Sequence, residues 1–266
     1  MCASYTPFPP DPVPPLDPRN PVAQALAKRQ RWSYFHTHRV DAALVSRAVA
    51  EKRSIEFDIW AEDWIVAIQH PPSFYKSRGE APPFNIDLED AVRLVEGGDD
   101  GCVVVLDAKS SAALACVNVL VARLGTHRCV VHAFCRELAF PRPAAVAHQA
   151  HWDDEDQPLE AVLRASWHGD TRAAVAVTCR HVTPERLDDP DLRVVDKCAH
   201  WLPGKADVVG LWLPRGVAPP KAVAARLLEA GVLVSFNADA EVKGAAALPA
   251  PCVCMTDHLD RASEHA

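Results

Sequence analysis

The stretch SIEFDIW (residues 54–60) places two acids, Glu56 and Asp58, among large apolar residues. Side chains of a β-strand point alternately to opposite faces, so both carboxylates lie on the same face. Carboxylates that face a protein interior are rarely buried unless they are paired or bind a cation. In an α/β barrel the catalytic groups lie at the C-terminal ends of the strands. The stretch therefore predicts a barrel strand that carries part of an active site.

The sequence around this stretch alternates between strand-like and helix-like segments, which is typical of βαβ units in a parallel sheet. Apolar residues at helical spacing predict helices at 40–52, 87–96, 111–124, 158–166 and 219–230. Short β-branched or aromatic runs predict strands at 32–37, 54–60, 102–108, 129–134, 173–178, 193–197, 206–213, 232–236 and 252–256. We expect a single (β/α)8 TIM-type barrel. Nine strand candidates are one too many, so 129–134, 173–178 or 193–197 is irregular or additional.

Two further segments complete the expected organisation. The extended run from Trp64 to His70 follows the second strand too closely for a crossover helix, which predicts a β-hairpin. Residues 1–20 contain so many prolines that a regular helix or a central strand is excluded there. We expect a partly disordered, proline-rich arm at 1–30 and one barrel domain at 31–262.

The composition argues against several classes of function. The formal net charge is -7 at pH 7 and the chain has no run of Lys or Arg, which disfavours binding to nucleic acid or to an anionic membrane. Since no apolar stretch is long enough to span a bilayer and the N-terminus lacks the order of a signal peptide, we expect a cytoplasmic protein without a transmembrane segment. We expect no obligate protein partner.

The nine cysteines are odd in number and mostly lie in apolar runs, which indicates small buried residues and no disulfide framework.

A second pair of charged residues, Asp107 and Lys109, ends the stretch CVVVLDAK (residues 102–109) with the same spacing of two. Together with Glu56 and Asp58, Asp107 would form an oxygen-rich site, which suits Mg²⁺ or Ca²⁺ better than Zn²⁺. The alternative is that Asp107 and Lys109 form a surface ion pair and that Glu56 is an edge residue.

Two histidines are placed to reach the same mouth of the barrel. His36 ends the first predicted strand, and His70 ends the hairpin. Because imidazoles titrate near neutral pH, one could remove a proton from an attacking oxygen while the other protonates a leaving oxygen. The alternative is that both histidines are structural.

The segments around His36, SIEFDIW (54–60), AIQHPP (67–72) and VVVLDAKS (103–110) resemble the menorin family. This family is related to the glycerophosphodiester phosphodiesterases and to the spider sphingomyelinase D toxins. The resemblance implies a barrel of the PLC-like phosphodiesterase kind, and it extends loosely over residues 205–260. It implies metal ligands at Glu56, Asp58 and Asp107, an acid/base pair at His36 and His70, a phosphate contact at Lys109 and a substrate-binding residue at His132. The stretch HTHR (36–39) departs from the H-R-G of the bacterial phosphodiesterases.

These residues lead to one principal expectation and two rivals. The principal expectation is a metal-dependent phosphodiesterase that cleaves a small or lipid-derived phosphodiester. One rival is a non-catalytic barrel in which the same residues form a pocket for binding, so that the protein serves as a binding or interaction module. The other is a lyase or isomerase that acts on a carbonyl substrate and has no phosphate affinity. The acid-flanked stretch HQAH (148–151) is interpreted as a solvated loop instead of a metal site.

Overall fold

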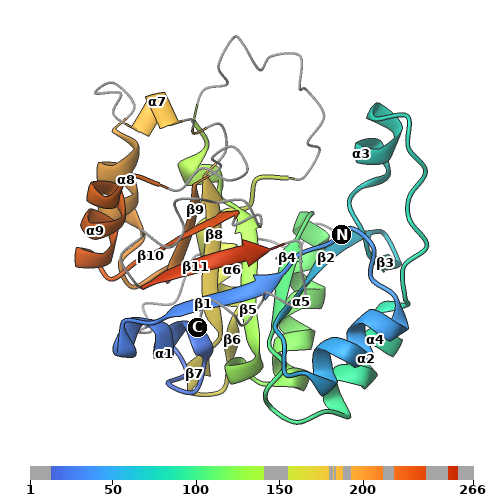
Figure 1. The fold of residues 1–266 in the computed structure, drawn as a ribbon. Helices are drawn as coiled ribbons and strands as arrows, with labels where there is room; N and C mark the ends of the chain where they lie inside the picture. Colours follow the sequence, from blue (N-terminus) through green and yellow to red (C-terminus); the bar gives the residue numbers. More distant parts are fainter. Residues whose placement is uncertain are drawn as a thin grey trace.

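Eight parallel strands close into a barrel within the part of the chain that the structure describes. The computed structural model describes residues 13–140, 155–179, 182, 184–187, 193–211, 219–237 and 251–256. Figure 1 shows the blue first strand beside the red last strand, and this pairing closes the ring. The strands follow one another around the barrel as β1 (Arg31–Phe35), β2 (Ile55–Glu62), β4 (Val104–Ala108), β5 (Cys129–Phe134), β8 (Ala174–Cys179), β9 (Val208–Leu211), β10 (Leu233–Asn237) and β11 (Cys252–Thr256). The expected TIM-type barrel is confirmed.

Helices between the strands cover the outside of the barrel (Figure 1). Side-chain caps fix the starts of several of them; the Asp41 carboxylate, for example, accepts a hydrogen bond from the Leu44 amide at 2.8 Å. The apolar faces of these helices pack on the outward side chains of the strands and form the larger core. The covering helices are α2 (Ala42–Ala50), α4 (Leu88–Glu96), α5 (Ser111–Leu124), α6 (Leu159–Ala165), α8 (Val194–Trp201) and α9 (Lys221–Glu229). The short helices α3 (Pro72–Ser77) and α7 (Pro184–Leu187) lie above the strands at the top of Figure 1.

The surplus strand candidate is 193–197, and the prediction of a strand there is wrong because these residues begin helix α8. The β-branched pair in RVVDK suggested a strand. The buried residues of this region, however, are Val194, Cys198 and Leu202, which recur every four residues and therefore lie on one face of a helix. The other two candidates form β5 and β8.

The hairpin after the second barrel strand is confirmed. Strand β3 (Ile65–Ile68) runs antiparallel to β2, and Ile59 is the partner of Ile68. The turn between them contains Asp63 with a φ of 53°, a left-handed conformation that Asp tolerates better than most residues. The hairpin carries the chain back toward the mouth of the barrel, where His70 follows.

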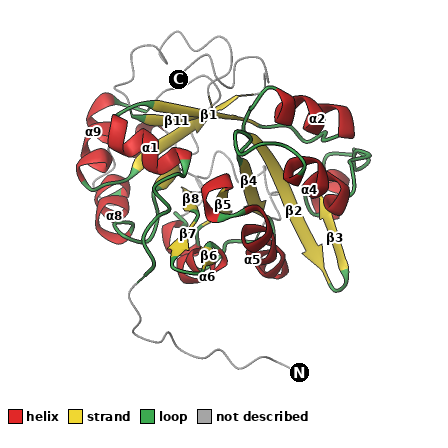
Figure 2. Ribbon diagram, turned by 90° about the horizontal axis from the view of Figure 1, so that it is seen from below, coloured by secondary structure: helices red, strands yellow, loops and turns green. Residues whose placement is uncertain are grey.

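The lower end of the barrel is closed by a helix in the segment that we expected to be an arm. Helix α1 (Pro21–Lys28) begins at Asn20, whose side chain accepts a hydrogen bond from the Val22 amide. Val22 and Ala25 pack against the apolar side chains that line the barrel interior, and Figure 2 views this end from below. Residues 1–12 lie outside the described residues, and the division at residue 30 stays a prediction.

Two further expectations concern the whole chain. The eight cysteines among the described residues are all free, and all but Cys116 are buried, which agrees with small core residues. None of the described helices combines the length and the apolar character that crossing a membrane requires. The cytoplasmic location and the absence of a protein partner or nucleic acid remain predictions.

Candidate active site

The charged residues of the predicted site lie on neighbouring strands at the C-terminal mouth of the barrel. In the strand register, Asp58 of β2 is the partner of Asp107 of β4, and Asp107 is the partner of His132 of β5. Glu56 lies two residues before Asp58 and therefore points to the same interior face. The three carboxylate residues are 2–3% exposed. Apolar residues such as Val105 and Val130 fill the interior beneath them, so the acids form the top layer of a packed core.

Lys109 lies between two of the carboxylates. Its Nζ is 3.0 Å from Oδ1 of Asp58 and 2.5 Å from Oδ2 of Asp107, and the lysine is 3% exposed. Burial of both partners excludes the alternative of a surface ion pair between Asp107 and Lys109. An ammonium held between two buried carboxylates favours the ionised form of both, because each negative charge lies directly beside the positive charge.

His132 completes a group of three possible ligands with Glu56 and Asp107. Its Nδ1 lies 3.1 Å from Oδ2 of Asp107 and 3.9 Å from Oε1 of Glu56. On the other side of the ring, Nε2 is 2.7 Å from the hydroxyl of Thr178. This hydroxyl fixes the orientation of the ring and can accept the Nε2 proton, which leaves the Nδ1 lone pair directed at the acids. We call Glu56, Asp107 and His132 the deep site.

Charge interactions at this mouth shift the acids in opposite directions. Burial, together with the negative charges of Asp107 and Asp58, raises the pKa of Glu56 well above its ordinary value. Burial also opposes ionisation of Asp58 and Asp107, but Lys109 and the nearby imidazoles outweigh it and lower the pKa of both. Glu56 is therefore the one of the three acids on which burial and the neighbouring negative charges outweigh the effect of the cations.

The charge and the hydrogen bonding of the deep site suit a bound cation. Three buried carboxylates face one buried ammonium, so ionisation of all of them leaves an excess of negative charge. Oε2 of Glu56 and Oδ1 of Asp107 are buried and have no hydrogen-bond partner among the described residues. Buried oxygens are seldom left in this state. A divalent cation would both neutralise the charge and satisfy the oxygens, so the residues present fit a metal ion.

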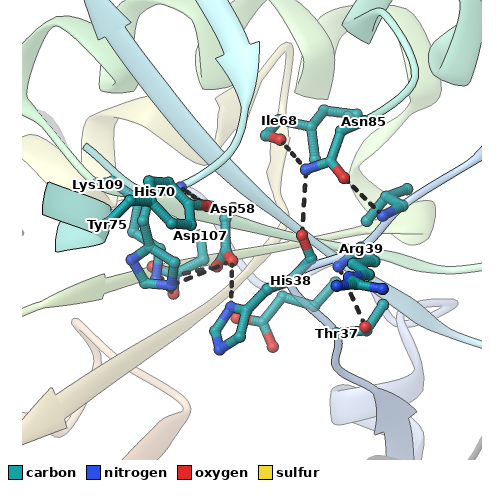
Figure 3. A network of polar contacts seen from close by, with 12 residues as sticks. Thr37, His38, Arg39, Asp58, Ile68, His70, Tyr75, Asn85, Asp107 and Lys109 are labelled. Carbon is teal, nitrogen blue, oxygen red and sulfur yellow. Dashed lines mark hydrogen bonds and ion pairs between the residues drawn. The ribbon is translucent and has the colours of Figure 1, made fainter. Parts of the chain in front are cut away.

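The predicted acid/base residues both lie beside Asp58. His70 is 1% exposed, its Nε2 is 3.3 Å from Oδ2 of Asp58, and its ring stacks on Phe74 with a centroid distance of 4.1 Å. The Tyr75 hydroxyl accepts a hydrogen bond from the His70 amide at 3.2 Å. His36 is half-buried at the rim and belongs to a second group of possible ligands with Asp58. Figure 3 shows His70 beside Asp58 and Lys109.

His38 also lies at the site, although in the sequence it stood out only as a departure from a motif. Its Nδ1 lies 3.5 Å from Oδ2 of Asp58 (Figure 3). The centroid of its ring is 4.9 Å from the ring centroids of His36 and His70. The signal in the sequence was the spacing: His36 and His38 are two residues apart at a strand end, so they can share a face.

Asn85 holds the loop that carries His38. Its Nδ2 donates hydrogen bonds to the carbonyls of His38 and Ile68, and its Oδ1 accepts one from the Val40 amide at 3.0 Å. Figure 3 shows this amide between the two segments that bring His38 and His70 to the site. Asn85 therefore links the loop after β1 to the end of the hairpin.

The structure thus brings together all seven residues that the sequence singled out. Their assigned roles remain predictions. Asp58 lies outside the deep site, because Lys109 contacts its Oδ1 while His38 and His70 lie beside its Oδ2. The stretch HQAH (148–151) lies outside the described residues.

Comparison with known proteins returned structural likenesses only. No family model matches the sequence, and no curated protein matches it. A ligand-free tryptophan synthase from M. tuberculosis is 12% identical, with 93% of this chain and 95% of that chain covered and a TM-score of 0.48. An oxaloacetate acetylhydrolase is 11% identical, with 92% and 81% covered and a TM-score of 0.47. A phosphonopyruvate hydrolase is 12% identical, with 94% and 83% covered and a TM-score of 0.48.

These findings correct the resemblance drawn from the sequence. The assignment to the menorin family and to the PLC-like phosphodiesterase kind is wrong, since no family model matches the sequence. Short motifs such as E-x-D recur on unrelated barrels because strand spacing alone puts two acids on one face. The strand pairing shows that the chain is a TIM-type (β/α)8 barrel.

Proposed function

We propose that this protein is a divalent-cation-dependent enzyme of the hydrolase or lyase type, with Mg²⁺ or a similar hard cation in the deep site. The observation that carries the proposal is the excess of buried carboxylate at the barrel mouth, with oxygens of Glu56 and Asp107 that lack a hydrogen-bond partner among the described residues. Carboxylate oxygens with one imidazole are donors that suit Mg²⁺ or Mn²⁺. When bound, such a cation polarises a carbonyl or phosphoryl oxygen of the substrate.

The remaining residues supply positioning and proton transfer. Lys109 keeps Asp58 and Asp107 ionised and fixes the distance between β2 and β4 at the mouth. The ring of His70 stacks on Phe74, its amide donates to the Tyr75 hydroxyl, and its Nε2 faces Asp58, which would orient the ring for proton transfer. We assign His70 as the proton-transfer group, with the predicted second imidazole, His36, nearer the rim.

A cation-dependent turnover assay tests this function. Metal-free protein is supplied with Mg²⁺ or Mn²⁺ and a panel of small carboxylic esters, phosphate esters and 2-oxo acids. We expect turnover that requires the cation and is lost in Glu56→Gln and in His70→Gln, whereas His168→Gln, at an exposed position, retains it. Cation binding without turnover of any compound by any variant would favour the rival binding module and contradict the catalytic proposal.

A second measurement separates the two substrate classes. Inorganic phosphate is titrated into the cation-loaded protein while the melting temperature is followed. A rise in melting temperature that Glu56→Gln abolishes supports a phosphoryl substrate, because the phosphate oxygens would share the deep-site cation. No rise supports a substrate with a carbonyl oxygen.

A further inference from the structure

A second group of possible ligands lies on the outer side of Asp58. His36, His38 and Asp58 each offer one ligand atom, and these atoms all lie within 4.8 Å of one another. We call these three residues the outer site. It shares no residue with the deep site, and the ammonium of Lys109 lies between the two, with contacts to Asp58 and to Asp107.

We propose that the outer site binds a transition-metal ion of the Zn²⁺ class, separate from the hard cation of the deep site. Two imidazoles and one carboxylate are the donor set of many catalytic zinc sites, which keep a fourth position for water or substrate. Imidazole nitrogen favours Zn²⁺, Co²⁺ and similar ions, whereas a set dominated by oxygen favours Mg²⁺. The two sites therefore differ in the ion that they select.

The geometry of Asp58 supports this assignment. Its Oδ1 is bound by Lys109, and its Oδ2 points away from the lysine toward His38 and His70, at 3.5 and 3.3 Å. Figure 3 shows the His38 ring directed at this carboxylate. One acid therefore presents one oxygen to the ammonium and the other to the outer site. In a tetrahedral zinc site with bonds of about 2.1 Å, ligand atoms are about 3.4 Å apart, so only small side-chain rotations are needed.

The position of the outer site also suits exchange of an ion with solvent. The side chain of His38 is 38% exposed, His36 is half-buried, and Asp58 is 3% exposed, so the ligands extend from the surface to the buried layer. Asn85 holds the backbone of His38 through its carbonyl, so the loop presents the His38 ring to Asp58. An outer ion would hold His36, and proton transfer would then fall to His70 alone.

Cobalt(II) titration of the EDTA-treated full chain tests the outer site directly. Co²⁺ can occupy sites that bind Zn²⁺. Its visible absorption is weak in the six-coordinate aqueous ion and stronger in a protein site with four or five ligands. We expect one such Co²⁺ equivalent in the wild type. We expect the intense band to disappear, and the affinity to fall at least about 10-fold, in His36→Gln and in His38→Gln, because loss of a ligand outweighs loss of an outer partner.

Control variants separate this site from the others. The band should persist in Glu56→Gln, which alters the deep site, in His168→Gln, and in the double variant His148→Gln/His151→Gln. Disappearance of the band only in the last variant would place the ion on that segment and overturn the proposal. An unchanged band in both His36→Gln and His38→Gln, or no band in the wild type, would also overturn it.

The test is independent of the proposed function. If the deep site does not bind the cation, the wild type and Glu56→Gln will bind Mg²⁺ equally, whatever the cobalt spectrum shows. Failure of the outer site appears only in the cobalt spectrum. Circular dichroism of each variant confirms that it is folded, and the exposure of His38 makes unfolding of His38→Gln unexpected.

Discussion

Nζ of Lys109 lies 3.0 Å from Oδ1 of Asp58, and both side chains are almost fully buried. The same nitrogen contacts Asp107, so one ammonium links two strands of the barrel. A buried charge that loses its partner destabilises a fold much more than the intact pair stabilises it. Because of this asymmetry, the free energy of unfolding should depend on the positive charges beside Asp58 and Asp107.

Lys109→Met should strongly destabilise the metal-free protein. Removal of the ammonium leaves Asp58 and Asp107 buried with only the neighbouring imidazoles to compensate their charge, which lowers the free energy of unfolding by about 3–5 kcal/mol. Added Mg²⁺ should restore part of this loss. Urea unfolding with EDTA and with Mg²⁺ measures both effects. The exposed Lys205 supplies the control, because Lys205→Met should change the free energy by less than about 0.5 kcal/mol. Equal stability of the two variants would refute the assignment.

The stability of the metal-free protein should fall as the pH rises above 4.5. The pKa of Glu56 is raised from its ordinary value of 4.5 in the folded state, so between these two values the folded protein binds the proton that the unfolded chain has released. Rising pH therefore favours unfolding, with a slope of up to about 1.4 kcal/mol per pH unit from this group. Unfolding with EDTA between pH 5 and 8 measures the slope, which Glu56→Gln should flatten. A slope that is unchanged in Glu56→Gln contradicts the shift.

Thr178→Val should weaken cation binding without unfolding the protein. The hydroxyl of Thr178 is 2.7 Å from Nε2 of His132, and loss of such a partner typically reduces metal affinity by about 10- to 100-fold. Thr178→Ser keeps the hydroxyl and should restore the affinity.

Gly210→Ala gives an independent test of the same contact. A Cβ at Gly210 would lie 2.4 Å from Oγ1 of Thr178, so the hydroxyl would have to move. Calorimetric titration with Mn²⁺ should therefore show the same direction of change as in Thr178→Val. Wild-type affinity in both variants would show that the hydroxyl does not support His132.

Arg172→Met should destabilise the fold and leave the site unaffected. At the lower end of the barrel, Arg172 donates to both carboxylate oxygens of Asp207, at 2.5 and 2.8 Å, and the pair is buried. An unpaired Asp207 lowers the free energy of unfolding by about 3–5 kcal/mol. The Mg²⁺ affinity of the folded variant should equal that of the wild type. The pair lies at the N-terminal ends of the barrel strands, whereas the site lies at their C-terminal ends. A large change in affinity would contradict this separation of the two ends.

Much of the fold was predictable because strand and helix periods differ. Runs such as CVVVLDA are too short and too β-branched for helices, and the helix at 111–124 matches its observed bounds. The segment at 193–197 misled because five residues are too few to show a helical period, which became visible only with Cys198 and Leu202. Helix α1 was not predicted, because the prolines before Pro21 exclude a regular helix only as far as residue 20, whereas the predicted arm was extended to residue 30.

The candidate site was predictable as a set of residues, whereas its contacts were not. The spacing of two in Glu56 and Asp58 placed both acids inside the barrel, and the C-terminal ends of the strands gathered them at one mouth. The strand register that makes Asp107 the partner of His132 is a tertiary property, so the sequence could not show that His132 lies beside Glu56 and Asp107. The family resemblance failed because motifs of this length carry little beyond strand spacing.

Mg²⁺ binding to the EDTA-treated protein, measured by isothermal titration calorimetry in the wild type and in Glu56→Gln, tests the central claim most directly. The acids at the barrel mouth are predicted to hold one Mg²⁺ in the wild type, with the affinity at least about 10-fold lower in Glu56→Gln. Absence of Mg²⁺ binding to the wild type, or equal affinity in the two proteins, would contradict the claim.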